Sequence, residues 1–276
     1  MSNMVTRALT GSLIVATILG GIYYDRSSFV GLFFVITTFG LWEFYTLAEK
    51  GGMAPQKLLG TIAGAAFFVI SSMYILRMIP LVYLLVIMPL MFLILIAELY
   101  RKSESPLVNI SITLSGIFYL SIPMVLLSYL SYPPAYGLRD NYDYNPNILL
   151  GFFLILWTND TFAYLVGKTL GKRKLFESVS PKKTWEGSFG GAVFSIVLAY
   201  FLVRFFPELR KRDWLVVAGI IVLFANLGDL IQSKFKRSVY VKDSGTVLPG
   251  HGGILDRFDG VYLAAPFVYT YIRYLQ

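Results

Sequence analysis

The chain has 276 residues, of which 56% are hydrophobic and only 14% are charged, with a net charge of +8 and no cysteine. Soluble domains average about 25% charged residues, so this composition excludes an ordinary soluble protein and indicates an integral membrane protein. The lack of cysteine excludes disulfides and thiolate metal sites, and the single histidine excludes a histidine-rich metal site.

Nine stretches are apolar enough to form transmembrane helices, each of which needs roughly 20 such residues. They are predicted near residues 7–24, 29–47, 58–76, 79–99, 107–130, 147–166, 186–206, 214–232 and 255–274. Only the segment 77–80 separates the third stretch from the fourth, and one bent helix there would reduce the number to eight. The predicted fold class is an all-α polytopic membrane protein, with its active site between C-terminal helices at the cytoplasmic face.

The Lys and Arg residues are distributed unequally between the two sides of the predicted membrane. Most of them lie on the side of the N-terminus, chiefly in two basic loops at 167–187 and 233–254. Because positively charged loops stay in the cytoplasm, the N-terminus and both loops are predicted to be cytoplasmic, at the inner membrane if the source is bacterial. This orientation depends heavily on those two loops.

Polar residues inside the predicted spans are concentrated after residue 147. Residues 1–130 are therefore interpreted as a helical scaffold that faces lipid, and residues 147–276 as the catalytic region. Asp160, Asn226 and Asp229 lie within predicted spans of that second region. A carboxylate at the bilayer centre costs about 2.5–3.5 kcal/mol, so such residues normally face a cavity or a partner.

The first basic loop contains Ser180, Lys182, Lys183 and Thr184 around Pro181. Two lysines and two hydroxyl groups supply the charge and the hydrogen bonds that a phosphate group needs. Attraction of the loop to an anionic lipid surface is the alternative interpretation.

The second basic segment, 233–259, is rich in glycine and charge between two apolar runs. Asp256 and Asp259 are three residues apart and are predicted in the first turns of the last helix, where the helix dipole favours anions. Gly252 and Gly253 allow the backbone to approach a ligand or to adopt a positive φ. His251 is expected to hold phosphate, to position a carboxylate or to cap the next helix.

Cations beside spaced carboxylates are what a phosphorylated substrate and a divalent metal ion together require. The residues of this segment, written with x for unspecified positions, are Ser233-x-Phe235-Lys236-Arg237-x-x-x-x-Lys242-Asp243-x-Gly245-x-x-Leu248-Pro249-x-His251-Gly252-Gly253-Ile254-x-Asp256-Arg257-Phe258-Asp259. This pattern resembles the signature of the phosphatidate cytidylyltransferases. The specific resemblance covers about residues 156–260, and the N-terminal half matches only as a run of membrane helices.

The resemblance implies a homodimeric membrane enzyme that makes CDP-diacylglycerol and pyrophosphate from CTP and phosphatidate, with Mg²⁺ as cofactor and no nucleic-acid partner. One or two divalent ions, with or without a monovalent cation, are expected. The phosphatidate phosphate would attack the α-phosphorus of CTP in line, without a covalent enzyme intermediate. The expected metal ligands are Asp229, Asp256 and Asp259, and the expected catalytic cations are Lys236, Arg237, Lys242 and Arg257. The expected substrate-binding residues are Ser180, Lys182, Lys183, Thr184, Ser233, Asp243, His251, Gly252, Gly253, Asn226 and Asp160, with Asp243 as a metal ligand or a lysine partner.

Two other functions are compatible with intramembrane carboxylates. A CDP-alcohol phosphotransferase requires an Arg and further aspartates after an Asp-Gly pair, and none follows Asp259-Gly260. An ion transporter would place polar groups in both halves of the chain, in inverted repeats, whereas here they are confined to the C-terminal half.

Overall fold

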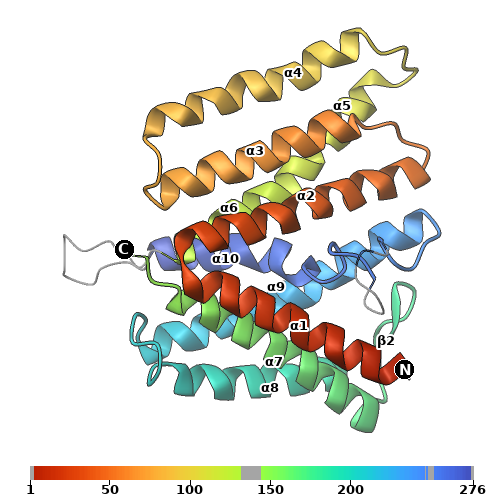
Figure 1. Cartoon of the computed structure of the whole chain (residues 1–276). Helices are drawn as coiled ribbons and strands as arrows, with labels where there is room; N and C mark the ends of the chain where they lie inside the picture. The colour runs from red at the N-terminus through yellow and green to blue at the C-terminus, as the bar shows by residue number, and fades with distance from the viewer. Residues whose placement is uncertain (1–2, 132–143, 246, 248–251, 275–276) are drawn as a thin grey trace. The chain divides into compact units, whose positions relative to one another are not determined.

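The computed structural model describes residues 3–131, 144–245, 247 and 252–274 (Figure 1). In this part of the chain, helices account for nearly all of the regular structure. The elements are α1 Asn3–Tyr24, α2 Arg26–Lys50, α3 Lys57–Ile75, a short 3₁₀ helix η1 Leu81–Val86 that leads into α4 Ile87–Leu99, α5 Pro106–Gly116, a π-helical turn η2 Ile117–Ser121, α6 Ile122–Leu130, α7 Asn147–Leu170, strands β1 Lys174–Phe176 and β2 Ser180–Thr184, α8 Trp185–Leu202, α9 Lys211–Ser238 and α10 Asp259–Tyr274.

Each predicted span corresponds to a helical segment in the described residues. Seven of these segments are long and apolar enough to cross a membrane: 26–50, 57–75, 81–99, 106–130, 147–170, 185–202 and 211–238. The chain is therefore an all-α multi-pass membrane protein. A short antiparallel β1–β2 hairpin joins α7 to α8.

A sharp turn separates α3 from α4, so the eight-helix alternative is wrong. Arg77 adopts a left-handed conformation with φ 54°, and the N–H of Met78 donates to the carbonyl of Met73. This is a common way for a helix to end, because it satisfies carbonyl groups of the last turn. Pro80 then precedes η1, where its lack of an N–H group is harmless.

Two predicted boundaries near the C-terminus were wrong. Helix α9 continues to Ser238, so Ser233, Lys236 and Arg237 are helical rather than part of a loop. No Gly or Pro interrupts this stretch, and cations are favourable at a helix C-terminus. Helix α10 begins at Asp259, so Asp256 lies in the turn before the helix instead of in its first turn.

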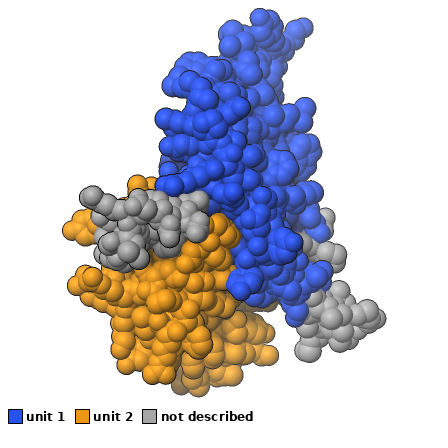
Figure 2. All heavy atoms as spheres, turned by 60° about the vertical axis from the view of Figure 1, so that its left-hand side comes forward, with its two compact units in different colours: residues 1–129, 238–258 blue, residues 130–237, 259–276 orange. Residues whose placement is uncertain are grey.

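The chain divides into two compact units, which are coloured separately in Figure 2. Unit 1 contains residues 1–129 and 238–258, and unit 2 contains residues 130–237 and 259–276. The segment 238–258 thus belongs with the N-terminal helices in space, although it follows α9 in sequence.

In unit 1, local sequence signals and buried polar contacts fix the helices. Asp25 caps α2 by accepting from the N–H of Ser27, and this hydrogen bond holds the pKa of Asp25 below its ordinary value. Inside the unit, the buried Glu98 carboxylate accepts from Gln56 at 2.6 Å and from Asn109 at 3.1 Å. A buried charge needs such partners, so these contacts hold α4 to neighbouring segments.

In unit 2, glycines allow helices to approach closely. A Cβ at Gly190 would lie 2.6 Å from Val166 of α7, and one at Gly228 of α9 would lie 2.5 Å from the carbonyl oxygen of Asp259. Helices α7 and α8 pack along much of their length, and the stacked rings of Phe224 and Phe267 join α9 to α10. This packing brings residues of α7, α9 and α10 together.

Candidate active site

Unit 2 contains a cluster of carboxylates with one lysine. Lys183 of β2 forms an ion pair with Asp229 of α9, with 2.5 Å between Nζ and Oδ2. Asp259, the first residue of α10, lies within electrostatic range of Asp229, Asp160 and Lys183. Three carboxylates beside one ammonium group leave the cluster with excess negative charge, which attracts a further cation.

Two other predicted residues of α9 lie beside this cluster. Ser233 donates a hydrogen bond of 3.2 Å to Oδ1 of Asp229, one turn earlier on the same helix. Asn226 donates to the carbonyl of Val222 in its own helix, at 2.7 Å. Asp229 therefore has a partner on each oxygen, while 34% of its side chain remains exposed.

The first basic loop is a folded hairpin, and its lysines differ in environment. Lys182 is exposed, whereas Lys183 is half-buried against Asp229.

The two hydroxyl residues of this loop have structural positions. Thr184 caps α8 by accepting from the N–H of Gly187 at 3.2 Å, so its hydroxyl has a structural partner. Ser180 pairs with Phe176 at the other end of the hairpin. The structure thus brings Lys183, and not the whole loop, to the carboxylates.

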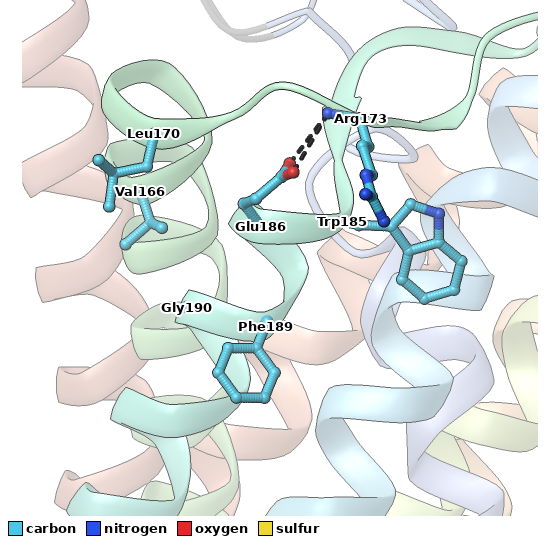
Figure 3. A pocket seen from close by; sticks show the side chains of 7 residues that line it. All are labelled: Val166, Leu170, Arg173, Trp185, Glu186, Phe189 and Gly190. Carbon is cyan, nitrogen blue, oxygen red and sulfur yellow. Dashed lines mark hydrogen bonds between the residues drawn. The ribbon is translucent and has the colours of Figure 1, made fainter.

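Glu186 holds the hairpin on α8. Its carboxylate accepts from the backbone N–H group of Lys172 at 3.0 Å. It also accepts from the backbone N–H group of Arg173 at 3.1 Å, as Figure 3 shows. Both donors are backbone N–H groups, so these two hydrogen bonds do not involve the side chains of Lys172 and Arg173.

An open pocket of about 660 Å³ lies beside this hairpin (Figure 3). Its walls come mainly from α7 and α8, and they are apolar apart from Arg173 and Glu186 at the loop. The lining residues are Val166, Leu170, Arg173, Trp185, Glu186, Phe189 and Gly190. A mostly apolar pocket with one arginine in its lining suits a ligand that is largely apolar and carries a polar group.

The glycine-rich segment, here residues 238–258, belongs to unit 1, where Asp256 shapes it. Oδ2 of Asp256 accepts from the N–H of Ser244 at 2.9 Å and from the N–H of Gly253 at 3.2 Å. Gly252 has φ 81°, which confirms the predicted need for glycine, and its missing Cβ leaves room for the same oxygen. These bonds fold the chain before α10, which explains why Asp256 is not helical.

The remaining predicted residues are distributed along the same part of the sequence. Lys242, Asp243 and Arg257 are exposed, Arg237 is exposed at the end of α9, and Lys236 is half-buried there. His251 lies outside the described residues, so its three expected roles stay predictions.

Sequence reasoning missed Glu43 of α2, in the region interpreted as a lipid-facing scaffold. Glu43 is only 4% exposed and accepts from the N–H groups of Ile254 and Leu255 at 3.1 and 2.8 Å. The hydroxyl of Ser244 donates to it as well, at 3.1 Å. A lone carboxylate within an apolar stretch, Leu41-Trp42-Glu43-Phe44-Tyr45, was the available signal.

Among the described residues, no group of three or more acidic, histidine or cysteine side chains is arranged to hold a metal ion. The donor chemistry nevertheless fits a hard divalent cation, because Asp229 and Asp259 offer carboxylate oxygens within one negative cluster. Mg²⁺ usually takes one or two protein carboxylates together with water and substrate phosphates, rather than a complete protein cage. The residues present therefore fit such an ion bound together with a phosphorylated substrate.

Comparison with known proteins gives concordant results. The family model described as the cytidylyltransferase family matches residues 5–275. The chain is 48% identical to a phosphatidate cytidylyltransferase of Staphylococcus epidermidis over 122 residues, which are 44% of this chain and 46% of that protein. It is 36% identical to a phosphatidate cytidylyltransferase of Rickettsia bellii over 182 residues, which are 63% of this chain and 73% of that protein.

The similarity to the staphylococcal relatives is strong but partial, because the chain spans a little under half of their length. The family model, in contrast, covers nearly all of the chain, including the unit 2 carboxylates and the glycine-rich segment. On that evidence, this chain belongs to the cytidylyltransferase family.

Proposed function

We propose that this protein transfers the cytidylyl group of CTP to phosphatidate, giving CDP-diacylglycerol and pyrophosphate. The observation that carries the proposal is the ion pair of Lys183 with Asp229, within a carboxylate cluster of unit 2. The same unit also contains a mostly apolar pocket, so it offers charge for phosphate groups and an apolar surface for a lipid. Relatives of the chain are named phosphatidate cytidylyltransferase.

In the proposed reaction, an ionised phosphate oxygen of phosphatidate forms a bond to the α-phosphorus of CTP. The bond from that phosphorus to the oxygen bridging to the β-phosphorus breaks, and pyrophosphate leaves with the electron pair. The attacking phosphate is already deprotonated at neutral pH, so the reaction needs no strong general base. The protein's task is to align the two anionic substrates and to offset their mutual repulsion.

Basic side chains and carboxylates would have different parts in this task. Lys183 and the cations of the glycine-rich segment, Lys242 and Arg257, would neutralise phosphate oxygens, together with Lys236 and Arg237. Asp229 and Asp259 would hold Mg²⁺, with Asp256 proposed as a third ligand from its position three residues before Asp259 in sequence. A bound divalent cation supplies neutralisation of phosphate charge during transfer.

The orientation and the assembly of the protein are proposals as well. The excess of Lys and Arg around the hairpin and at the C-terminal end of α9 supports a cytoplasmic location for the N-terminus and the site. A homodimer is proposed from the family resemblance alone.

The direct test is pyrophosphate release by the purified full-length chain in detergent, with phosphatidate, CTP and Mg²⁺. We expect release that requires both substrates and stops with EDTA, and CDP-diacylglycerol should be found by mass spectrometry. Replacing phosphatidate by diacylglycerol, which lacks the attacking phosphate, is the matched control. Folded protein that releases no pyrophosphate would overturn the proposal.

Lys183 is half-buried against Asp229, whereas Lys174 of the same hairpin is exposed. Removing the positive charge should therefore have different effects at the two positions. Lys183→Met should raise the KM for phosphatidate or CTP about 10- to 100-fold, because a charge-assisted contact to phosphate contributes about 1.5–3 kcal/mol. Lys174→Met removes an exposed charge from the same hairpin and should change the KM less than about threefold. Initial rates at varied substrate concentrations measure both, and equal effects would refute a specific role for Lys183.

A further inference from the structure

The two ends of the glycine-rich segment are held by carboxylates from different parts of unit 1. Asp256 accepts from the backbone of Ser244 and Gly253, and Glu43 accepts from the hydroxyl of Ser244 and from the backbone of Ile254 and Leu255. Asp256 belongs to the segment itself, whereas Glu43 comes from α2, far away in sequence. Glu43 therefore connects the segment to a transmembrane helix.

The environment of Glu43 is specific for a carboxylate. Oε1 accepts from Ile254 and Oε2 accepts from Leu255 and Ser244, so both oxygens act as acceptors. A buried carboxylate in an apolar helix is costly unless such donors compensate it, and an apolar residue would serve packing alone equally well. The free-energy cost of burying the Glu43 carboxylate is therefore offset only when the glycine-rich segment places these three donors against it.

Two glycines of the segment lie directly against the side chain of Glu43. A Cβ at Gly245 would collide with Oε1 of Glu43, and a Cβ at Gly253 would collide with Oε2. Neither glycine has a positive φ, so close approach of the carboxylate, not backbone conformation, explains the need for glycine at these positions. Gly245 and Gly253 thus both leave space for the carboxylate of Glu43.

We propose that Glu43 is a positioning residue, which clamps Ser244 and Ile254–Leu255 so that the residues next to them are presented to the phosphate groups of the substrates. Asp243 precedes Ser244, and Asp256 and Arg257 follow Leu255 directly. Glu43 acts through these residues and does not itself touch substrate. The expected effect of Glu43 on the reaction rests on the proposed function. The clamp itself rests only on the contacts of Glu43 with Ser244, Ile254 and Leu255.

The test compares Glu43→Gln with the wild-type chain by hydrogen exchange and by kinetics. Glutamine has one acceptor oxygen, so its NH₂ group would face a backbone N–H. We expect the amides of Ile254 and Leu255 to exchange about tenfold faster, while amides elsewhere in α2 keep their protection. We expect kcat to fall about 10- to 100-fold, as for other residues that orient a catalytic group, with a smaller change in the KM for CTP.

Glu98→Gln is the matched control for loss of a buried carboxylate in the same unit. Its partners are Gln56, Asn109 and Arg101, none of which belongs to the glycine-rich segment. It should lower the melting temperature and leave kcat within about twofold. If Glu98→Gln lowers kcat as much as Glu43→Gln does, the role of Glu43 is only structural and the inference is wrong.

Ser244→Ala is the milder second variant in case Glu43→Gln does not fold. It removes one of the three donors to Glu43 and keeps the backbone bond to Asp256, so kcat should fall about threefold to tenfold with faster exchange at Leu255. Unchanged exchange in both variants overturns the clamp, whatever the activity. Wild-type protein that releases no pyrophosphate overturns the proposed function instead, because hydrogen exchange needs no substrate.

Discussion

The Asp229→Asn protein is expected to fold normally and to lose about 10³-fold in kcat, since several kcal/mol of charge stabilisation corresponds to about three factors of ten in rate. Asparagine still accepts the hydrogen bond of Ser233, and the side chain is partly exposed, so stability should change little. What is lost is the negative charge that orients Lys183 and that is proposed to bind Mg²⁺. Pyrophosphate release at saturating substrate and several Mg²⁺ concentrations measures the effect.

The matched control is Asp213→Asn, in the first turn of the same helix. Asp213 is buried and accepts from the hydroxyl of Tyr271 at 3.0 Å, at the end of α9 opposite to Asp229. Loss of its charge should affect melting temperature and leave kcat within about twofold. An Asp229→Asn enzyme with full activity would eliminate Asp229 as a metal ligand.

Gly228→Ala is expected to lower stability by about 1–3 kcal/mol and activity by about 100-fold. The new Cβ would lie 2.5 Å from the carbonyl oxygen of Asp259, which is a backbone atom and cannot rotate away. Helices α9 and α10 must therefore separate, and the separation displaces Asp259 relative to Asp229. A displacement of about 1 Å at a catalytic group is enough for such a loss of rate.

Gly219→Ala is the control for this change, because the same substitution in the same helix meets no atom within 4 Å. It should be neutral or stabilising by up to about 1 kcal/mol, since alanine is the better helix former. Thermal unfolding in detergent and the pyrophosphate assay measure both variants. If Gly228→Ala retained wild-type activity, close contact of α9 with Asp259 would be irrelevant to the reaction.

The helices were predictable because their signals are local. Each predicted span is an apolar run of sufficient length, and the structure places a helix at each one. The errors occurred where polarity was taken as a helix end: Lys236 and Arg237 are polar but helical. Asp256 was assigned to a helix by spacing, whereas its carboxylate accepts from two backbone groups before α10 begins.

The site was predictable only as a set of residue types. Spacing and charge selected Asp229, Asp259 and Lys183, and they are close to one another in unit 2. Charge did not distinguish Lys183 from the neighbouring Lys182, since adjacent residues of a strand point to opposite sides and the direction depends on how the hairpin is held. Glu186 holds it through two backbone N–H groups.

By itself, the sequence determined the multi-pass helical architecture, the glycine-rich segment and the carboxylates to consider, because apolar content and short-range spacing are properties of neighbouring residues. Tertiary structure decided that Lys183 pairs with Asp229 and that Glu43 holds Ser244, which is 201 positions away in the chain. Such contacts depend on which segments pack together, and no local pattern around Glu43 specifies its partners.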